Sequence, residues 1–140
     1  MSLPTKTLAW TLQNRVADGR VDFSDSPSAT FKLVEKDLPS ESELSPSALL
    51  VQTVYIGNDA GQLLYISTDE RVLSSRAAKR MPGLPKDSTM WAFTVSRVLK
   101  VGGATGSEGD GKFKEGDLVL TMGVWAYYAV VEKGQANLVQ

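Results

Sequence analysis

Residues 48–56 read Ala-Leu-Leu-Val-Gln-Thr-Val-Tyr-Ile, an almost continuously apolar run. Such a run predicts a strand that is buried on both faces or nearly so. Residues 37–47, which are rich in serine, acids and proline, form the loop before it, and residues 57–61 (Gly-Asn-Asp-Ala-Gly) break it. The sequence therefore predicts one buried strand between two loops.

Two shorter strands are predicted before this run. Residues 5–12 form the first. Residues 29–35 alternate in polarity, which places Phe31 and Leu33 inward and the polar residues outward.

The longest alternating segment is 91–101, Trp-Ala-Phe-Thr-Val-Ser-Arg-Val-Leu-Lys-Val. It is predicted to form a strand, and the residues expected on one side of it are Trp91, Phe93, Val95, Leu99 and Val101. A glycine-rich loop follows at 102–112. Residues 117–122 and 125–132 are then predicted to pair with each other around Gly123.

One helix is predicted, over residues 68–80, with Thr68 as its N-cap and residues 81–83 as its end. The charged residues at its two ends complement the helix dipole and carry no further prediction: Asp69, Glu70, Lys79 and Arg80. About six short strands and one or two short helices are typical of a small, partly open β-barrel. We therefore predict a mainly β fold, as a single domain over residues 1–140.

The composition excludes several classes of chemistry. The chain has no cysteine and no histidine, so disulfides, thiol nucleophiles, Cys-based zinc sites and histidine bases are absent. Fifteen Lys and Arg against 16 Asp and Glu give a net charge of −1. The sequence therefore has no excess of positive charge that would favour binding to nucleic acid or to an anionic membrane. No apolar stretch approaches the roughly 18 residues of a membrane span, and residues 1–10 carry no secretory signal. We expect a cytoplasmic protein.

Four segments carry a family resemblance through their order. Residues 31–39 resemble a strand that leads into an acid-Leu-Pro corner, and residues 50–59 resemble a central strand and its loop. Residues 113–119 (Phe-Lys-Glu-Gly-Asp-Leu-Val) match a Phe-Lys-x-Gly-Asp-x-Val turn, and residues 125–131 resemble a Trp-x-Glu-Tyr-x-Val strand. Together they are similar to the N-terminal GroES-like domain of the zinc-independent medium-chain dehydrogenase/reductase superfamily, in particular the prostaglandin/leukotriene reductase-like members.

The resemblance implies a substrate-binding half without its nucleotide-binding half. The family continues into a Rossmann domain, whereas this chain ends at Gln140. Residues 102–111 lack the Gly-x-Gly-x-x-Gly spacing that binds a pyrophosphate and are interpreted as a flexible loop. The Cys and His ligands of the zinc alcohol dehydrogenases have no counterpart. We expect no cofactor and no metal.

The loop after the central strand departs from the family. Where the family reads Asp-Pro-Tyr-Met-Arg, residues 59–63 read Asp-Ala-Gly-Gln-Leu, and a tyrosine returns only at Tyr65. Asp59 and Tyr65 are the candidate catalytic residues. Asp59 follows a buried strand directly, where burial would make it a usable acid or base; alternatively it is a turn aspartate that binds its own backbone.

Aromatic and amide side chains are the candidates for binding an apolar ligand, because Tyr and Trp join an apolar body to one polar group. The predicted substrate-binding residues are Tyr55, Asn58, Gln62, Trp125 and Tyr127. Trp91 and Tyr128 are further large groups that could line the same face. The alternatives are core packing for the aromatic residues and solvent exposure for Gln62. Lys112 and Lys114 are interpreted as a solvated turn.

Three functions remain open. The first is a stand-alone domain that binds a hydrophobic small molecule and catalyses a cofactor-independent, non-redox step in secondary metabolism: isomerisation, dehydration or cyclisation. The second is the substrate-binding half of a split or truncated NADPH-dependent reductase. The third is a non-catalytic binding module. An exposed apolar face, through which a homodimer could form, is compatible with all three.

Overall fold

The computed structural model describes residues 2–75, 83–104 and 109–139. Within them the fold is mainly β, with two sheets, short helices and no closed barrel, which confirms the predicted fold class. The chain divides into two compact units. The sheet unit comprises Met1–Ala9, Glu35–Gly57 and Trp91–Gln140, and the loop unit comprises Trp10–Val34 and Asn58–Met90. The single domain expected over residues 1–140 stays a prediction.

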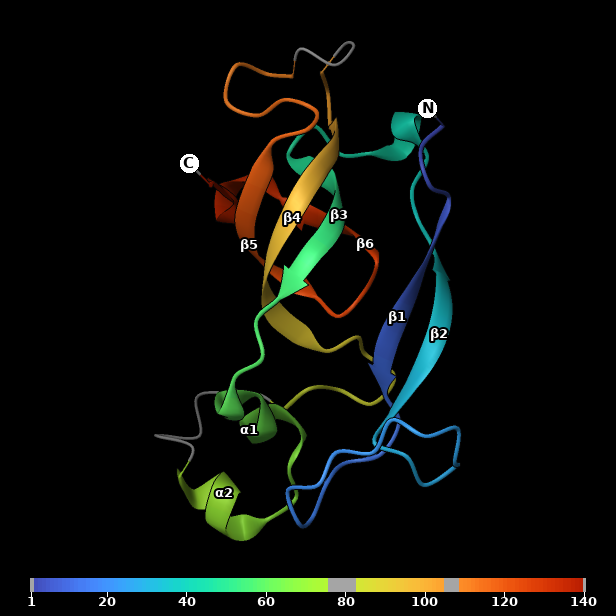
Figure 1. Cartoon of the computed structure of the whole chain (residues 1–140), viewed down its shortest axis with the longest axis vertical. Coiled ribbons are helices and arrows are strands. Elements are labelled where there is room, and N and C mark those ends of the chain that lie inside the picture. Colours follow the sequence, from blue (N-terminus) through green and yellow to red (C-terminus); the bar gives the residue numbers. More distant parts are fainter. Residues whose placement is uncertain (1, 76–82, 105–108, 140) are drawn as a thin grey trace. The chain divides into compact units, whose positions relative to one another are not determined.

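Five antiparallel strands form the main sheet of the sheet unit, in the order β6-β3-β4-β5-β7 (Figure 1). The strands are β3 (Ala48–Ile56), β4 (Trp91–Val101), β5 (Leu118–Val124), β6 (Tyr128–Glu132) and β7 (Asn137–Leu138). Two 3₁₀ turns, η1 (Glu41–Glu43) and η4 (Lys133–Gln135), lie outside them. The largest cluster of buried apolar residues in this unit is Leu49, Val51, Val98, Val101, Phe113, Val119, Ala129, Val131 and Ala136.

Strand β3 is buried along only part of its length. Ala48–Val51 are buried, whereas Tyr55 is 70% exposed and Ile56 is 39% exposed. The prediction of burial over the whole of 48–56 was therefore wrong. Tyr55 stands opposite Val95, and Val95 stands opposite Leu120, which is 45% exposed. This end of β3 therefore lies in a sheet face that is exposed to solvent.

The strand predicted at 91–101 is confirmed as β4. Its alternation is also present, but Phe93 on the predicted apolar side is 61% exposed, whereas Thr94 and Ser96 on the other side are buried. The apolar side in the first half of β4 is thus the outer one. Further along, the pairing with β3 skips Leu99, since Leu50 stands opposite Lys100 and Val51 opposite Val98. Beyond this irregularity, Val101 is buried.

The predicted pairing of 117–122 with 125–132 was wrong. Both segments contain a strand, but β5 pairs with β4 and β7, while β6 pairs with β3. The connection begins with a turn in which the Ala126 N–H donates to the Val124 carbonyl (2.9 Å), and Ala126 then bridges to Ala9. The chain therefore crosses from one part of the sheet to another instead of folding back as a hairpin.

The two-stranded sheet consists of β1 (Lys6–Leu12) and β2 (Phe31–Asp37), and each strand passes from one unit into the other along the sequence. Phe31 is fully buried, as predicted, and stacks on Phe23 at a centroid distance of 5.4 Å. Leu33 is 48% exposed, so its predicted inward orientation was wrong. The stacking contact with Phe23 covers the Phe31 side chain. It does not extend to Leu33, which therefore remains exposed.

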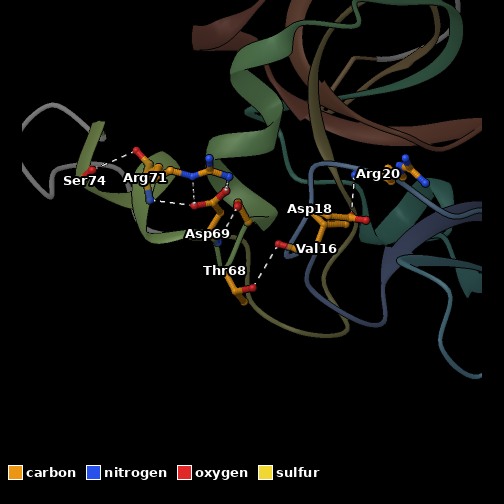
Figure 2. A network of polar contacts seen from close by, with 8 residues as sticks. Val16, Asp18, Arg20, Thr68, Asp69, Arg71 and Ser74 are labelled. Atoms are coloured by element: carbon orange, nitrogen blue, oxygen red, sulfur yellow. Dashed lines mark hydrogen bonds and ion pairs between the residues drawn. The ribbon is translucent and has the colours of Figure 1, made fainter.

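The loop unit contains η2 (Ala60–Gln62), α1 (Leu63–Ile66) and α2 (Glu70–Ser75). The predicted helix over 68–80 corresponds to α2, and its residues 76–80 lie outside the described part of the chain. The predicted N-cap was wrong by one residue, as Figure 2 shows. Asp69 Oδ1 accepts the Arg71 N–H (2.9 Å), while the Thr68 hydroxyl donates to the Val16 carbonyl (3.3 Å). No helix in the described residues is long and apolar enough to cross a membrane.

Candidate functional site

The predicted site residues belong to different units. The sheet unit holds Tyr55, Trp125 and Tyr127, and the loop unit holds Asn58, Asp59, Gln62 and Tyr65. The two groups are therefore considered separately.

Asp59 is held in a local turn. Its Oδ1 accepts the Gly61 N–H (2.6 Å), and its own N–H donates to Gln62 Oε1 (3.0 Å), which together form a capping box for η2. Asn58 and Asp59 are exposed. The alternative of a turn aspartate bound to its own backbone thus describes the geometry, and the catalytic role of Asp59 and the substrate-binding role of Asn58 stay predictions.

Tyr65 is fixed through its backbone. Its carbonyl accepts from Arg15 Nη1 (3.0 Å) and from the Leu84 N–H (2.7 Å), while Arg15 Nη2 donates to the Leu84 carbonyl (2.7 Å). Arg15 thereby ties α1 to the segment before Ser88. The side chain of Tyr65 is half-buried. The catalytic role predicted for Tyr65 stays a prediction.

The sheet unit contains a groove at Tyr127, one of the predicted substrate-binding residues. Its volume is about 180 Å³. We call it the Tyr127 groove, and its lining residues are Lys6, Thr7, Leu8, Glu35, Tyr127 and Tyr128. Tyr127 itself is 64% exposed. Neither Tyr55 nor Trp125 belongs to this lining.

Backbone bonds between β1 and the start of β6 position the groove. The Tyr127 N–H donates to the Leu8 carbonyl (3.1 Å), and the Tyr128 N–H donates to Thr7 Oγ1 (2.9 Å). The Tyr127 carbonyl in turn accepts the Thr53 N–H from β3 (2.9 Å). Tyr127 is thus anchored on both sides through its main chain, which leaves its ring exposed at a defined place.

Lys6 and Glu35 form the charged part of the groove. Lys6 Nζ lies 2.5 Å from Glu35 Oε1, and both side chains are 56% exposed. The hydrogen bond that Lys6 donates to Glu35, and then the negative charge of Glu35, raise the pKa of Lys6. Lys6 therefore stays an ammonium ion at neutral pH, which makes it a hydrogen-bond donor and removes it as an amine nucleophile.

Sequence reasoning missed most of this groove. Tyr127 was predicted and Tyr128 was considered, but Lys6, Leu8 and Glu35 were not. Lys6 and Glu35 are 29 positions apart, and no local pattern joins them. Only the pairing of β1 with β2 brings them together.

A second hollow of about 370 Å³ lies at the glycine-rich turn of the sheet unit. Its lining residues are Gly111, Lys112, Phe113, Lys114, Asp117 and Leu138. Lys112 Nζ sits 4.8 Å from the centre of the Phe113 ring. Both lysines are exposed, as the prediction of a solvated turn requires. Within the described residues, no group of three or more acidic side chains could hold a metal ion.

No family model matches this chain. It is similar to an uncharacterized membrane protein of Saccharomyces cerevisiae, with 29% identity over 127 residues, which are 89% of this chain and 30% of the yeast protein. Among solved structures, it is similar to CurA from Vibrio vulnificus, with a TM-score of 0.62 and 20% identity over 94% of this chain and 32% of CurA.

CurA has also been solved in complex with NADPH, and that structure gives a TM-score of 0.60. A putative NADPH:quinone reductase from Mesorhizobium loti gives 0.54, with 17% identity over 100% of this chain and 38% of that protein. What these structures share with the chain is a fold.

The chain spans about a third of the length of the proteins it matches. The solved neighbours include proteins named as an NADPH:quinone reductase and a quinone oxidoreductase, and at 17% and 14% identity they show a shared fold. Membership of the medium-chain superfamily stays a prediction. The GroES-like assignment and the lack of a Rossmann domain stay predictions.

Proposed function

We propose that this chain binds a small hydrophobic carbonyl compound in the Tyr127 groove. The observation that carries the proposal is the combination of Leu8, Tyr127 and Tyr128 with an ammonium group oriented by Glu35. Binding sites for small molecules typically combine apolar and aromatic walls with a few placed polar groups.

The size of the groove limits the ligand. A cavity of about 150 Å³ accommodates a benzene ring, and the groove measures about 180 Å³. A single six-membered ring bearing a carbonyl group therefore fits. The quinones named for the reductases of similar fold belong to this class.

The polar groups suit a carbonyl oxygen. The Lys6 ammonium can donate to it, since Nζ has three N–H donors and Glu35 Oε1 occupies one of them. A charge-assisted hydrogen bond of this kind stabilises the negative charge that develops when the carbonyl compound forms an enolate.

The same pair supports a cofactor-independent reaction, and we propose double-bond isomerisation. Glu35 takes the proton from the carbon between the carbonyl and the double bond of a β,γ-unsaturated ketone, while Lys6 stabilises the resulting dienolate oxygen. Glu35 then returns the proton to the γ-carbon, so that the product is the conjugated ketone and nothing is consumed. This reaction needs no histidine, thiol, metal or nicotinamide.

A second candidate function is the substrate-binding part of an NADPH-dependent reductase. The supporting observation is the fold shared with about a third of CurA, a protein solved in complex with NADPH. In that case a separate nucleotide-binding region supplies the hydride, and the Tyr127 groove holds the acceptor.

One set of reactions separates the two candidates. Cyclohex-3-en-1-one is incubated with the chain, and formation of cyclohex-2-en-1-one is followed by its ultraviolet absorbance. We expect isomerisation without NADPH, with losses of roughly tenfold or more for Lys6→Met and Glu35→Gln. Lys86→Met is the matched control, because Lys86 is an exposed lysine outside the groove.

A result in which the chain binds the ketone but does not isomerise it also separates the two candidate functions. Binding of the enone without isomerisation, together with NADPH oxidation only when a nucleotide-binding protein is added, supports the reductase candidate. Equal isomerisation by the chain and by Lys6→Met contradicts the proposed reaction.

A further inference from the structure

Strands β4 and β5 bury their small and polar side and expose their apolar side. Thr94, Ser96 and Thr121 are each at most 2% exposed. Gly123 faces the same side, since a Cβ placed on it would lie 2.4 Å from Thr94 Oγ1. This is the reverse of the usual arrangement, in which the polar side of an antiparallel sheet faces water.

The exposed side is continuous across three strands. In the antiparallel register, Phe93 lies opposite Met122, and Val95 lies opposite both Leu120 and Tyr55. Opposed residues point to the same face of a sheet. We call this surface the apolar sheet face, and its residues are Tyr55, Trp91, Phe93, Val95, Leu118, Leu120 and Met122.

The exposed apolar area is comparable to that of the largest patch on a typical monomer, about 300–600 Å². Tyr55 is 70% exposed, Phe93 61%, Met122 46% and Leu120 45%. If each fully exposed side chain offers about 200 Å², these four alone present roughly 400 Å² of apolar surface. The largest apolar patch on a monomer is often functional, so this face is a candidate interaction site.

One charge lies on this face, at one end. Arg97 is exposed and stands opposite Leu118 on β5 and Gln52 on β3. Trp91 lies at the other end of the same face, six residues away along β4, which corresponds to roughly 20 Å. The face positions on the described parts of β3, β4 and β5 hold no acidic residue that could pair with Arg97.

We propose that the apolar sheet face binds a second copy of this chain. The two-fold axis crosses β4 between Phe93 and Val95, so that the β4 strands of the two copies run antiparallel. Two sheets then pack face to face at the usual separation of about 10 Å. Each Phe93 contacts the Val95 of the partner subunit, and the large exposed side chains of both copies become buried.

Charge favours this axis over the other two-fold arrangement. With the axis across β4, each Arg97 lies over the Trp91 of the partner subunit and gains a cation–π contact. With the axis along β4, the two Arg97 side chains would meet, and like charges in a buried interface are destabilising. The proposal does not depend on the Tyr127 groove.

Sedimentation equilibrium on the full chain, at concentrations up to roughly 100 µM, tests the proposal. We expect a concentration-dependent dimer. Phe93→Asp should abolish it, and Arg97→Glu should weaken the dimer about tenfold, since an anion is repelled by the face of an indole. Leu33→Asp is the matched control. Like Phe93, Leu33 is a large apolar side chain that is exposed (48%), but it lies on β2, outside the apolar sheet face. It should leave the dimer unchanged.

The folding of each variant is checked by its far-ultraviolet circular dichroism and its melting temperature. Phe93 and Arg97 are exposed, so both variants should melt near the parent temperature when dilute enough to be monomeric. A chain that stays monomeric at the highest concentration overturns the proposal, as does a dimer that both variants leave intact. In the first case, the face is open to a different apolar ligand or protein.

Discussion

Lys133 Nζ lies 2.6 Å from Asp110 Oδ2 and also donates to the Gly102 carbonyl at 2.9 Å. One lysine after β6 thereby joins both ends of the glycine-rich segment that follows β4. The other oxygen of Asp110 accepts the N–H groups of Lys112 (3.1 Å) and Phe113 (3.0 Å). The segment that the sequence indicated as a flexible loop is thus anchored at its described ends by one carboxylate and one ammonium group.

The pH dependence of stability should report on this contact. The hydrogen bond from Lys133, followed by the Phe113 N–H, lowers the pKa of Asp110 to about 2. The unfolded value is about 3.9, so the ionised carboxylate stabilises the fold above pH 4, and this contribution is lost as the pH falls through about 2. Asp110→Asn should cost about 1 kcal/mol at pH 7, after allowance for solvent screening, and little at pH 2.

Urea denaturation at both pH values measures this difference. Asp25→Asn is the matched control, since Asp25 is an exposed aspartate in the loop unit, and it should change stability little at either pH. An Asp110→Asn chain as stable as the parent at pH 7 would show that the contact contributes nothing.

Gly123→Ala should destabilise the sheet unit. A Cβ at Gly123 would lie 2.4 Å from Thr94 Oγ1 and 3.0 Å from its Cγ2, on the buried side near one end of the β4–β5 pairing. Overpacking of this kind typically costs about 1–3 kcal/mol. The double variant with Thr94→Ala should recover part of the loss. Gly134→Ala is the control, because no atom lies within 4 Å of its added Cβ. Thermal denaturation of the parent, Gly123→Ala, the double variant and Gly134→Ala distinguishes a steric clash at Gly123 from a general effect of replacing glycine by alanine.

Asp69 should matter more to α2 than Arg71 does, although the two form an ion pair of 2.8 Å (Figure 2). Asp69 caps the helix through the Arg71 N–H, whereas the Arg71 side chain is 90% exposed. We expect Asp69→Ala to lower the melting temperature by a few degrees and Arg71→Ala to lower it less. The side-chain hydrogen bond from Arg71 lowers the pKa of Asp69, so the effect of Asp69→Ala should shrink as the pH falls below the ordinary aspartate range. Equal effects of the two variants would contradict a capping role.

The strands could be predicted from the sequence, but not which of their faces is covered. Period-two alternation in 91–101 correctly indicates β4. The same alternation is compatible with two orientations of the strand, one with the apolar side in a core and one with the apolar side facing outward. Phe93 is exposed because the buried side of β4 carries Thr94 and Ser96. The sequence holds no signal for that inversion, since burial depends on which other strands lie above each face.

The Tyr127 groove shows the same limit. Tyr127 could be predicted as a candidate binding residue, although it lies just before β6 and not within the strand predicted over 125–132. Lys6 and Glu35 could not, because their contact requires β1 and β2 to pair across 29 positions. Asp59 illustrates the opposite error: its place after an apolar strand suggested burial, but β3 is already exposed at Tyr55 before the turn begins.

The central claim is that the Tyr127 groove binds a small hydrophobic carbonyl compound, and an NMR titration of the labelled chain with cyclohex-2-en-1-one tests it most directly. We predict saturable shifts for the backbone amides of Lys6, Leu8, Glu35, Tyr127 and Tyr128, and roughly tenfold weaker binding by Tyr127→Ala. Tyr55→Ala is the matched control, because Tyr55 is equally exposed but lies outside the groove. Shifts that gather elsewhere, or binding that Tyr127→Ala leaves unchanged, would contradict the account.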